Sequence, residues 1–508
     1  MSSVQLSSAQ SPFILVIDIG TSSLRALVYD ANAREVENFI ARVKYQPDTT
    51  DDGGSTLDAR AMFAAFTRAL DEIHALIQNK IEIAAVAACS LASNVLALDA
   101  QFEPLTPAFL YADTRNANVV EQLRAAHDWS PLYARTGCPL HTAYLPARFL
   151  WLRQTQPEIF SRAAHFVSLH EFFLEKLFER AGVAHSFAAW TGMLNHATKD
   201  WDEQVIQVAG IERAQLSPLC SITAAFTELR AEFAARWKLL ARIPWYPALG
   251  DGAAANVGSG CVDETRVAIT IGTSGALRVV MDAQRGLETL PRGLWMYRVD
   301  ERAGLVGGAL TDGGSILRYF GNIFSTMEHA ELQAELERMK PDAHGLTFLP
   351  FFAGERSPGY HGDARATLTG WNLNTTPLEI ARAAMEAVAY RFAAMYDLLR
   401  VAIPQPREIV ASGGALLHSR AWMQILADVL NVSVTASGEE EASARGAALL
   451  ALRSLGILPS LETLPASLGE TFAPNPAHYE IYQSARKRHE SLYYLILDAS
   501  PLTPLLKF

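Results

Sequence analysis

Two stretches of the chain share one pattern of apolar and polar positions: an apolar run, a short Gly-Thr-Ser turn and a second apolar run. Short apolar runs rich in β-branched residues and separated by turn residues predict a strand, a turn and a strand. The identical tetrapeptides Ile19–Ser22 and Ile271–Ser274 form the two turns, about half a chain apart. The predicted strands around them are Phe13–Asp18 and Leu24–Asp30 in the first half, and Val267–Thr270 and Leu277–Asp282 in the second.

The distance between the two copies indicates a duplicated domain. Solenoid repeats recur every 20–50 residues or so, a much shorter period. Two similar α/β domains that face each other across a cleft account for the pattern, with a boundary near Gly258–Glu264. We therefore expect an N-terminal domain over residues 1–260 and a C-terminal domain over residues 261–508.

Helical periodicity supplies the α part of this α/β architecture. Apolar side chains recur at the spacing of one buried helix face, at Phe63, Phe66, Leu70, Ile73 and Ile77.

The last third of the chain predicts a long helix followed by a strand–helix–strand unit. Thr376 and Glu379 have the spacing of a capping box, with Pro377 at the first helical position, so a helix should begin there and run to about Val401. The later elements are a strand at Glu408–Ala411, a helix at Ser419–Leu430, a strand at Val432–Thr435 and a helix of small residues at Ala442–Leu455.

Composition excludes several classes of function. The chain has 508 residues, 50% of them hydrophobic, and 43 Lys and Arg against 54 Asp and Glu, a net charge of −11. Without a basic block, we expect no nucleic-acid partner and no binding to an anionic membrane. The most apolar stretch, Ile83–Leu98, is interrupted by polar residues, so we interpret it as a strand, a loop and a second strand rather than a membrane span.

Cysteine usage and the N-terminal residues favour a cytoplasmic protein. The four cysteines are far apart and form no Cys-x-x-Cys pair, which argues against a disulfide framework or a structural zinc site. Met1–Pro12 has no basic segment, so we expect no signal peptide.

The first Gly-Thr-Ser turn has the chemistry of a phosphate site. Gly20 permits a tight turn that exposes backbone amides, and Thr21 and Ser22 add hydroxyl donors. Asp18, at the end of the preceding strand, is suitably placed to hold Mg²⁺ through water. An ordinary hairpin turn is the alternative interpretation of this single motif.

The second turn strengthens the phosphate interpretation. Gly272 and Thr273 repeat the first turn, but Thr270 stands where the first copy has Asp18. Two matching turns could hold opposite sides of a polyphosphate, with a metal-linked carboxylate in only one half. This asymmetry suits a nucleotide bound between duplicated domains.

Other nucleotide motifs fit less well. The chain contains no Gly-x-x-x-x-Gly-Lys-Ser/Thr sequence, which excludes a P-loop. Gly250–Ala255 resembles a degenerate dinucleotide fingerprint but does not follow an uninterrupted predicted strand. Asp251 begins a small-residue helix, where it could act as an N-cap of low pKa, as a group that orients a reacting hydroxyl, or as both.

From Phe13 to about Leu455 the chain resembles the FGGY family of carbohydrate kinases. The matching stretches are Asp18–Ser23 and Gly272–Ser274 for the two phosphate motifs, Ser412–Ala415 for the adenosine motif, Asp251–Gly258 around the catalytic aspartate, Tyr111–Arg115, Gly307–Arg318 and Phe348–Pro358. The resemblance implies two ribonuclease-H-like domains of the actin and sugar-kinase superfamily, with ATP and Mg²⁺ bound in the central cleft.

The resemblance also implies roles for individual residues. Asp251 would be catalytic, and Asp18 would be the metal-linked carboxylate. The implied nucleotide-binding residues are Gly20, Thr21, Ser22, Gly272, Thr273, Gly313, Gly413 and Gly414, and the implied substrate-binding residues are Ser93, Asn94, Asp113 and Asp251. Two alternatives stay open at this point: Gly313 could simply belong to a turn, and Asp113 could form a structural ion pair with Arg115.

The substrate is the least determined part of this interpretation. Thr136–Pro139, Trp201-Asp202 and Ser412–Trp422 look most like gluconate kinases, with xylulose kinases next. Where many family members carry Met-His, however, this chain has Ala92-Ser93, followed by Asn94.

We therefore expect an ATP-dependent kinase of a small sugar or sugar acid, with gluconate favoured and D-xylulose second. An actin-like or chaperone-like ATPase that phosphorylates no sugar is the alternative from another class. A homodimer is compatible with the sequence, which does not fix the oligomeric state.

Overall fold

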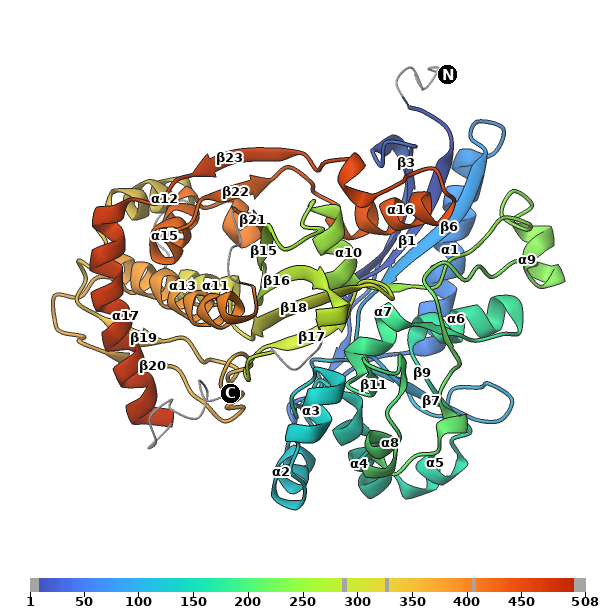
Figure 1. Ribbon diagram of the computed structural model, residues 1–508, viewed down its shortest axis with the longest axis horizontal. Coiled ribbons are helices and arrows are strands. Elements are labelled where there is room, and N and C mark those ends of the chain that lie inside the picture. Colours follow the sequence, from blue (N-terminus) through green and yellow to red (C-terminus); the bar gives the residue numbers. More distant parts are fainter. Residues whose placement is uncertain (1–8, 286–289, 325–328, 404–407, 498–508) are drawn as a thin grey trace.

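The computed structural model describes residues 9–285, 290–324, 329–403 and 408–497 of the chain, and Met1–Ser8 lies outside them. Within these ranges the protein is an α/β molecule with two main sheets, one in each half of the sequence (Figure 1). No helix in these ranges is long and apolar enough to cross a membrane.

The first sheet has five strands in the order β14-β6-β1-β2-β3. Strand β1 is antiparallel to β2 and parallel to β6, and β2 is antiparallel to β3. Its strands are β1 (Phe13–Ile19), β2 (Ser23–Tyr29), β3 (Glu35–Lys44), β6 (Ile83–Ser90) and β14 (Leu249–Gly250).

The second sheet repeats this topology and extends it. Strand β15 is antiparallel to β16 and parallel to β21, as β1 is to β2 and β6. The order is β17-β18-β16-β15-β21-β22-β23. Its strands are β15 (Arg266–Ile271), β16 (Gly275–Asp282), β17 (Trp295–Arg298), β18 (Ala303–Leu310), β21 (Glu408–Ser412), β22 (Val434–Ser437) and β23 (Leu468–Phe472). The predicted duplication and the ribonuclease-H-like topology are confirmed.

The predicted helices form close to their expected bounds. Helix α1 (Ala59–Ile77) begins after Asp58, whose side chain accepts a hydrogen bond from Ala61 N at 2.7 Å. Helix α13 (Pro377–Ala402) begins with the expected capping box between Thr376 and Glu379. The other helices used below are α2 (Ala117–Ala126), α4 (Leu145–Thr155), α6 (Leu169–Phe178), α7 (His185–Ala188), α10 (Asp251–Gly258), α14 (Gly414–Leu417), α15 (Arg420–Leu430), α16 (Ala442–Ser454) and α17 (Pro476–Leu497).

The strand–helix–strand unit near the C-terminus is also confirmed, because β21 and β22 are parallel and α15 connects them. The second strand lies two residues later than expected, at Val434–Ser437. The apolar stretch Ile83–Leu98 forms β6 and then β7 (Leu96–Leu98), as expected.

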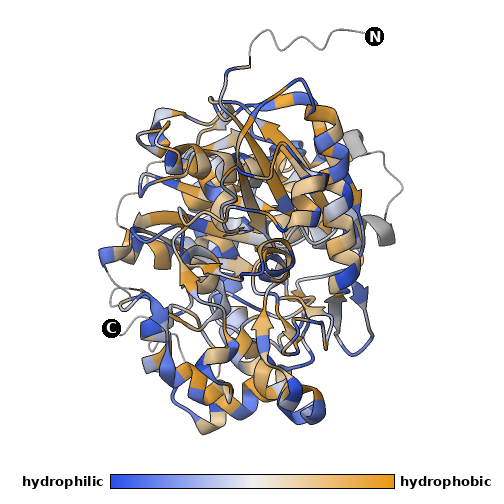
Figure 2. Cartoon of the chain, turned by 90° about the vertical axis from the view of Figure 1, so that its right-hand side faces the viewer, coloured by the Kyte–Doolittle hydropathy of each residue, from blue (hydrophilic) through white to orange (hydrophobic). Residues whose placement is uncertain are grey.

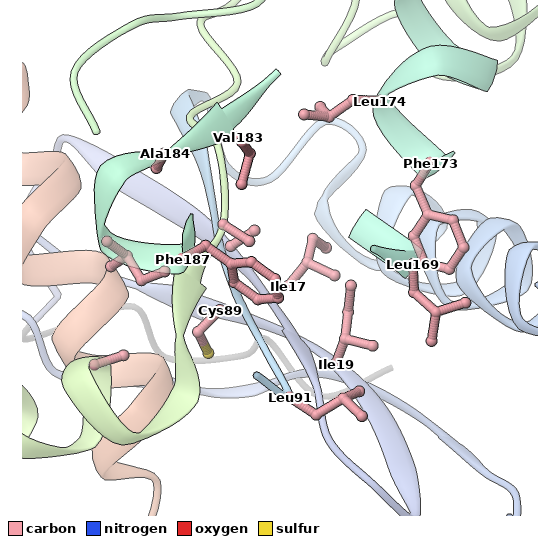
Figure 3. Close-up of a cluster of buried hydrophobic side chains, with 14 of the residues drawn as sticks. Ile17, Ile19, Cys89, Leu91, Leu169, Phe173, Leu174, Val183, Ala184 and Phe187 are labelled. Atoms are coloured by element: carbon pink, nitrogen blue, oxygen red, sulfur yellow. The ribbon is translucent and has the colours of Figure 1, made fainter. Parts of the chain in front are cut away.

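The first hydrophobic core includes side chains from both halves of the sequence. Figure 3 shows Ile17 and Cys89 gathered with Phe187 of α7, and Leu169 and Phe173 of α6 beside them. Helix α16 belongs to this core although its residues come late in the sequence, and it packs against β1 and β6 (Figure 1). The domain division at residue 260 stays a prediction. Helix α16 comes after this division in the sequence but packs into the first hydrophobic core.

The second core lies between the second sheet and helices α13, α15 and α17. The central strands are largely hydrophobic, whereas the outer helices carry bands of hydrophilic residues (Figure 2). Both sheets are therefore supported from behind, and their Gly-Thr-Ser turns face a common cleft.

Candidate active site

A cavity of about 810 Å³ lies between the two halves and gathers most of the predicted motifs. Its lining includes Thr21 of the first turn, Ser274 of the second, Asp251 at the start of α10 and Gly413 before α14. A second cavity of about 930 Å³ adjoins it and shares Tyr111 and three other lining residues with it. Because they share these residues, the two cavities form one continuous cleft.

Backbone contacts tighten the first turn. Gly20 N donates to Ser23 O at 3.0 Å, and the Tyr45 hydroxyl donates to Gly20 O at 2.5 Å. Of the three predicted residues in this turn, Thr21 lines the cavity, while Gly20 and Ser22 form the loop behind it.

The second turn is fixed by two adjacent glycines from another segment, Gly313 and Gly314. Gly313 N donates to Thr273 O at 3.0 Å, and Gly314 N donates to Gly272 O at 2.8 Å. A Cβ on Gly313 would lie 2.7 Å from Ser274 O, so only glycine permits this approach. Gly313 thus supports the turn from behind and does not line the cavity. Its predicted contact with the nucleotide stays a prediction.

The predicted adenosine glycines lie on the cleft side of α14. Gly413 has a φ of +91°, and a Cβ there would lie 2.4 Å from Ile271 O, so glycine is required. Gly413 and Gly414 both line the main cavity.

Asp18 is almost fully buried near the end of β1 and pairs with Arg25 of β2. Arg25 also pairs with Glu441, just before α16, so one guanidinium connects the first turn to the second half of the sequence. Because Mg²⁺ binds one or two carboxylates plus water and phosphate oxygens, the single buried Asp18 at this turn fits the metal implied by the sequence. Arg25 would then share the Asp18 carboxylate with it.

Asp251 differs from its sequence-based expectation. Gly250 is the N-cap of α10, and Asp251 is the first helical residue, with its Oδ1 accepting a hydrogen bond from Gly252 N at 2.8 Å. The expected low pKa is also wrong: burial raises the pKa of Asp251 to about 6, against the opposing effects of Arg278 and the Gly252 amide. Desolvation of the carboxylate therefore exceeds the stabilisation from the helix N-terminus.

A layer of aromatic rings borders Asp251. Trp190 stacks on Tyr297 at 3.8 Å between ring centroids, and Tyr297 stacks on Trp295 at 4.2 Å. A Cβ on Gly250 would lie 2.4 Å from Trp190 Nε1, so the glycine before Asp251 makes room for this ring.

The predicted substrate residues separate into two groups. Ser93 lines the main cavity and has a φ of +54°, and its hydroxyl donates to Trp190 O at 2.6 Å. Asn94 is buried away from the cavity, where its amide accepts from Leu169 N at 2.8 Å and donates to Leu91 O at 2.7 Å. These bonds give Asn94 a structural role.

Asp113 is fully buried and does not line either cavity. It pairs with Arg115 at 2.5 Å and with Arg148 of α4 at 2.7 Å, and it accepts a hydrogen bond from Ser55 N at 3.1 Å. The structural ion pair with Arg115, one of the two alternatives that the sequence left open, is therefore present, and a contact of Asp113 with the substrate stays a prediction.

The residues that line the main cavity and were missed by sequence reasoning include Trp190, Arg278 and Trp295; Arg356 lies in the matching stretch Phe348–Pro358 but received no role. No local motif marks the first three, because their importance comes from the side of the element on which they lie. Arg278 offers the one usable signal, since it is a charged residue in the middle of an otherwise apolar strand.

This arrangement is the one expected of a two-domain phosphotransferase: two similar α/β sheets, a Gly-Thr-Ser turn in each, and a carboxylate at a helix start on the cavity wall. Residues 13–258 match the N-terminal domain of the FGGY family of carbohydrate kinases, and residues 267–455 match its C-terminal domain. The chain belongs to the FGGY family of carbohydrate kinases, and it is an ATP-dependent sugar kinase. Enzymes of this family use ATP and generally require Mg²⁺.

The similar proteins include kinases of two substrates. The gluconokinase of Bacillus subtilis strain 168 is 27% identical over 503 residues, covering 96% of each chain. The xylulose kinase of Lactococcus lactis is 26% identical over 486 residues, covering 93% of this chain and 95% of that protein. The gluconate kinase structure from Lactobacillus acidophilus superposes with a TM-score of 0.88 at 24% identity, covering 96% of this chain and 98% of that one, which supports the fold. These relatives do not favour the alternative of an actin-like or chaperone-like ATPase.

Proposed function

We propose that this enzyme transfers the γ-phosphoryl group of ATP to a hydroxyl of a small sugar or sugar acid, with gluconate as the favoured substrate and D-xylulose as the second candidate. The observation that carries this proposal is Asp251, a carboxylate on the cavity wall between the two turns whose pKa is raised to about 6. A carboxylate of that pKa is ionised at neutral pH and is still basic enough to accept a proton.

Each predicted motif has a part in this reaction. Asp251 orients the acceptor hydroxyl and takes its proton as the phosphoryl group transfers, a reaction that depends mainly on positioning. Thr21 in the first turn and Thr273 in the second bind the phosphates through backbone amides and hydroxyls, on loops whose shape depends on Gly20, Ser22 and Gly272. Gly413 and Gly414 accommodate the adenosine.

Asp18 would hold Mg²⁺ through water. When bound, that ion neutralises charge on the phosphates. Arg25, which bridges Asp18 and Glu441, keeps this carboxylate in place at the end of β1. We further expect a cytoplasmic enzyme, and a homodimer stays compatible with the sequence.

The preference for gluconate rests on the sequence similarity to gluconate kinases and is tested by a substrate panel. Purified enzyme is incubated with ATP and Mg²⁺ and with gluconate, other sugar acids, D-xylulose and further neutral sugars, and ADP release is followed. We expect turnover to depend on the sugar and to be fastest with gluconate. Equal ADP release with and without every sugar would contradict the proposal and support an ATPase.

A further inference from the structure

Two arginines that face the main cavity have no anionic partner. Within the part of the chain that the structure describes, neither Arg278 nor Arg356 forms an ion pair, and Arg278 Nε is buried without a hydrogen-bond acceptor. Several fully buried arginines of this protein form ion pairs, such as Arg148 with Asp113 and Arg382 with Glu386, whereas Arg298 donates to backbone carbonyls instead. Arg278 and Arg356 are partly buried and have neither kind of partner in the described ranges, and withdrawing a cation from water without a partner is costly, so this arrangement favours an anionic ligand.

The position of Arg278 separates it from the phosphate turns. It lies on β16 three residues after Gly275, about 10 Å along the strand from the second turn. A Cβ on Gly252 would lie 3.2 Å from Arg278 Nε, which places this guanidinium beside the start of α10. Arg278 and Asp251 influence each other's pKa but are not close enough to form an ion pair. A small molecule could therefore contact both at once.

The aromatic layer supplies further donors on the same wall. Trp295 is 2% exposed, and its Nε1 has no acceptor among the described residues; the buried Nε1 of Trp190 is likewise without one. An indole N–H can only donate. Two tryptophans with these unpaired indole N–H groups and two arginines therefore line one cavity, whose lining suits a ligand rich in acceptor oxygens, as a hydroxylated carboxylate is.

Among the described residues, the carboxylates that line the main cavity do not pair with these arginines. Glu441 pairs with Arg25 and Arg42, and Glu439 pairs with Arg445. Burial lowers the pKa of the Arg278 guanidinium, and the nearby charge of Arg356 lowers it further, against the opposing effect of Asp251. An anion bound beside both arginines would relieve this repulsion.

We propose that Arg278, together with Arg356, binds the carboxylate of the sugar acid and thereby selects acids over neutral sugars. This inference rests on the proposed function, because it concerns the acceptor bound beside Asp251. The carboxylate end of the acceptor lies at Arg278, the reacting hydroxyl lies at Asp251, and the aromatic layer borders the carbon chain between them.

The test compares gluconate with D-gluconamide, which has the same hydroxyl groups but no charge, at saturating ATP. The variants are Arg278→Gln, Arg278→Lys and, as a control with the same charge change, Arg302→Gln, which alters an exposed residue of the same half. We expect the wild type to prefer gluconate over gluconamide in kcat/KM by about 30-fold or more, the range for losing one member of a buried charge pair. Arg278→Gln should abolish this preference and leave the KM for ATP unchanged, while Arg302→Gln should change neither.

Arg278→Lys is the control for a loss of activity caused by misfolding of Arg278→Gln. It keeps the charge but loses the bidentate geometry, so part of the preference for gluconate should remain. Quenching of tryptophan fluorescence by gluconate without ATP gives a second readout, because Trp190 and Trp295 border the pocket.

Three results would overturn the assignment. The first is a fall in kcat/KM that is equal for gluconate and gluconamide in both Arg278 variants. The second is a raised KM for ATP, which would assign Arg278 to the nucleotide phosphates, and the third is a wild type that prefers D-xylulose to gluconate. A wild type that phosphorylates no sugar or sugar acid would instead refute the proposed function itself.

Discussion

Gly258 of α10 and Gly446 of α16 meet where the two helices cross between the halves of the molecule. A Cβ on Gly446 would lie 1.9 Å from Ala254 O and 3.0 Å from Gly258 N, and a Cβ on Gly258 would lie 1.8 Å from Ala442 O. The Arg445 guanidinium donates to Gly258 O at 2.6 Å beside this contact. The helix that begins at Asp251 is thereby held directly against the late helix α16.

Gly446→Ala should destabilise the protein. Helix propensity alone would stabilise the alanine variant by about 1 kcal/mol, but the new methyl group overlaps the α10 backbone, and overpacking costs about 1–3 kcal/mol or more. We expect a net loss in the free energy of unfolding, measured by denaturant titration. Gly469→Ala is the control, because its Cβ would meet only ordinary contacts at 3.4–3.5 Å; an equal effect of both substitutions would contradict the close crossing.

The two sheets could be predicted from the sequence because their signals are local. The repeated Gly-Thr-Ser turn, the helical spacing from Phe63 to Ile77 and the capping box at Thr376 each depend on neighbouring residues. The packing of α16 into the first core could not be predicted in this way. It depends on contacts between Gly446 and residues nearly two hundred positions earlier, which leave only small residues as a trace in the sequence.

Asp251→Asn should preserve folding and nucleotide binding and lower kcat. The amide keeps the shape of the side chain but cannot accept the proton of the acceptor hydroxyl, an effect typically worth about 10²–10⁴-fold. Steady-state kinetics with ADP release and a separate binding measurement with ADP check this. Turnover within a few-fold of the wild type would remove Asp251 from the catalytic role.

The raised pKa of Asp251 predicts opposite pH effects on activity and stability. The base must be ionised, so kcat/KM should rise through about pH 6 and level off above it. The folded state holds the Asp251 proton more tightly than the unfolded state, so ionisation destabilises the fold above pH 6, and this cost is absent below about pH 4.

Asp251→Asn should therefore raise the free energy of unfolding by about 1–3 kcal/mol at pH 7 and not at pH 4. Denaturant titrations of both proteins at the two pH values test this. An increase in the free energy of unfolding that is the same at both pH values would show that burial does not destabilise the ionised carboxylate.

Asp18→Ala should raise the Mg²⁺ concentration needed for half-maximal activity by about 10–100-fold, the usual effect of losing a group that orients the ligands of a metal. Arg25 loses one of its two partners in this variant and keeps Glu441. Binding of metal-free ADP, followed by calorimetry, should change less. Identical Mg²⁺ dependence in wild type and variant would rule out the metal role of Asp18.

The site was predictable where a motif carries the chemistry. Thr21, Gly413 and Asp251 line one cavity, as the repeated turn and the family resemblance led us to expect. Asn94 and Asp113 are buried in structural contacts, because polar residues next to a site in sequence can turn into the core instead. Arg278 was missed, since only the packing of helix α10 against strand β16 brings it beside Gly252.

The central claim is that this enzyme uses ATP to phosphorylate a sugar acid. Its most direct test is mass spectrometry of the products when gluconate, ATP and Mg²⁺ are incubated with the wild type and with Asp251→Asn, with ADP measured in parallel. The account predicts phosphogluconate and ADP in equal amounts from the wild type, and almost none of either from the variant. ADP formed without any phosphorylated acid, or in equal amounts by both proteins, would contradict it.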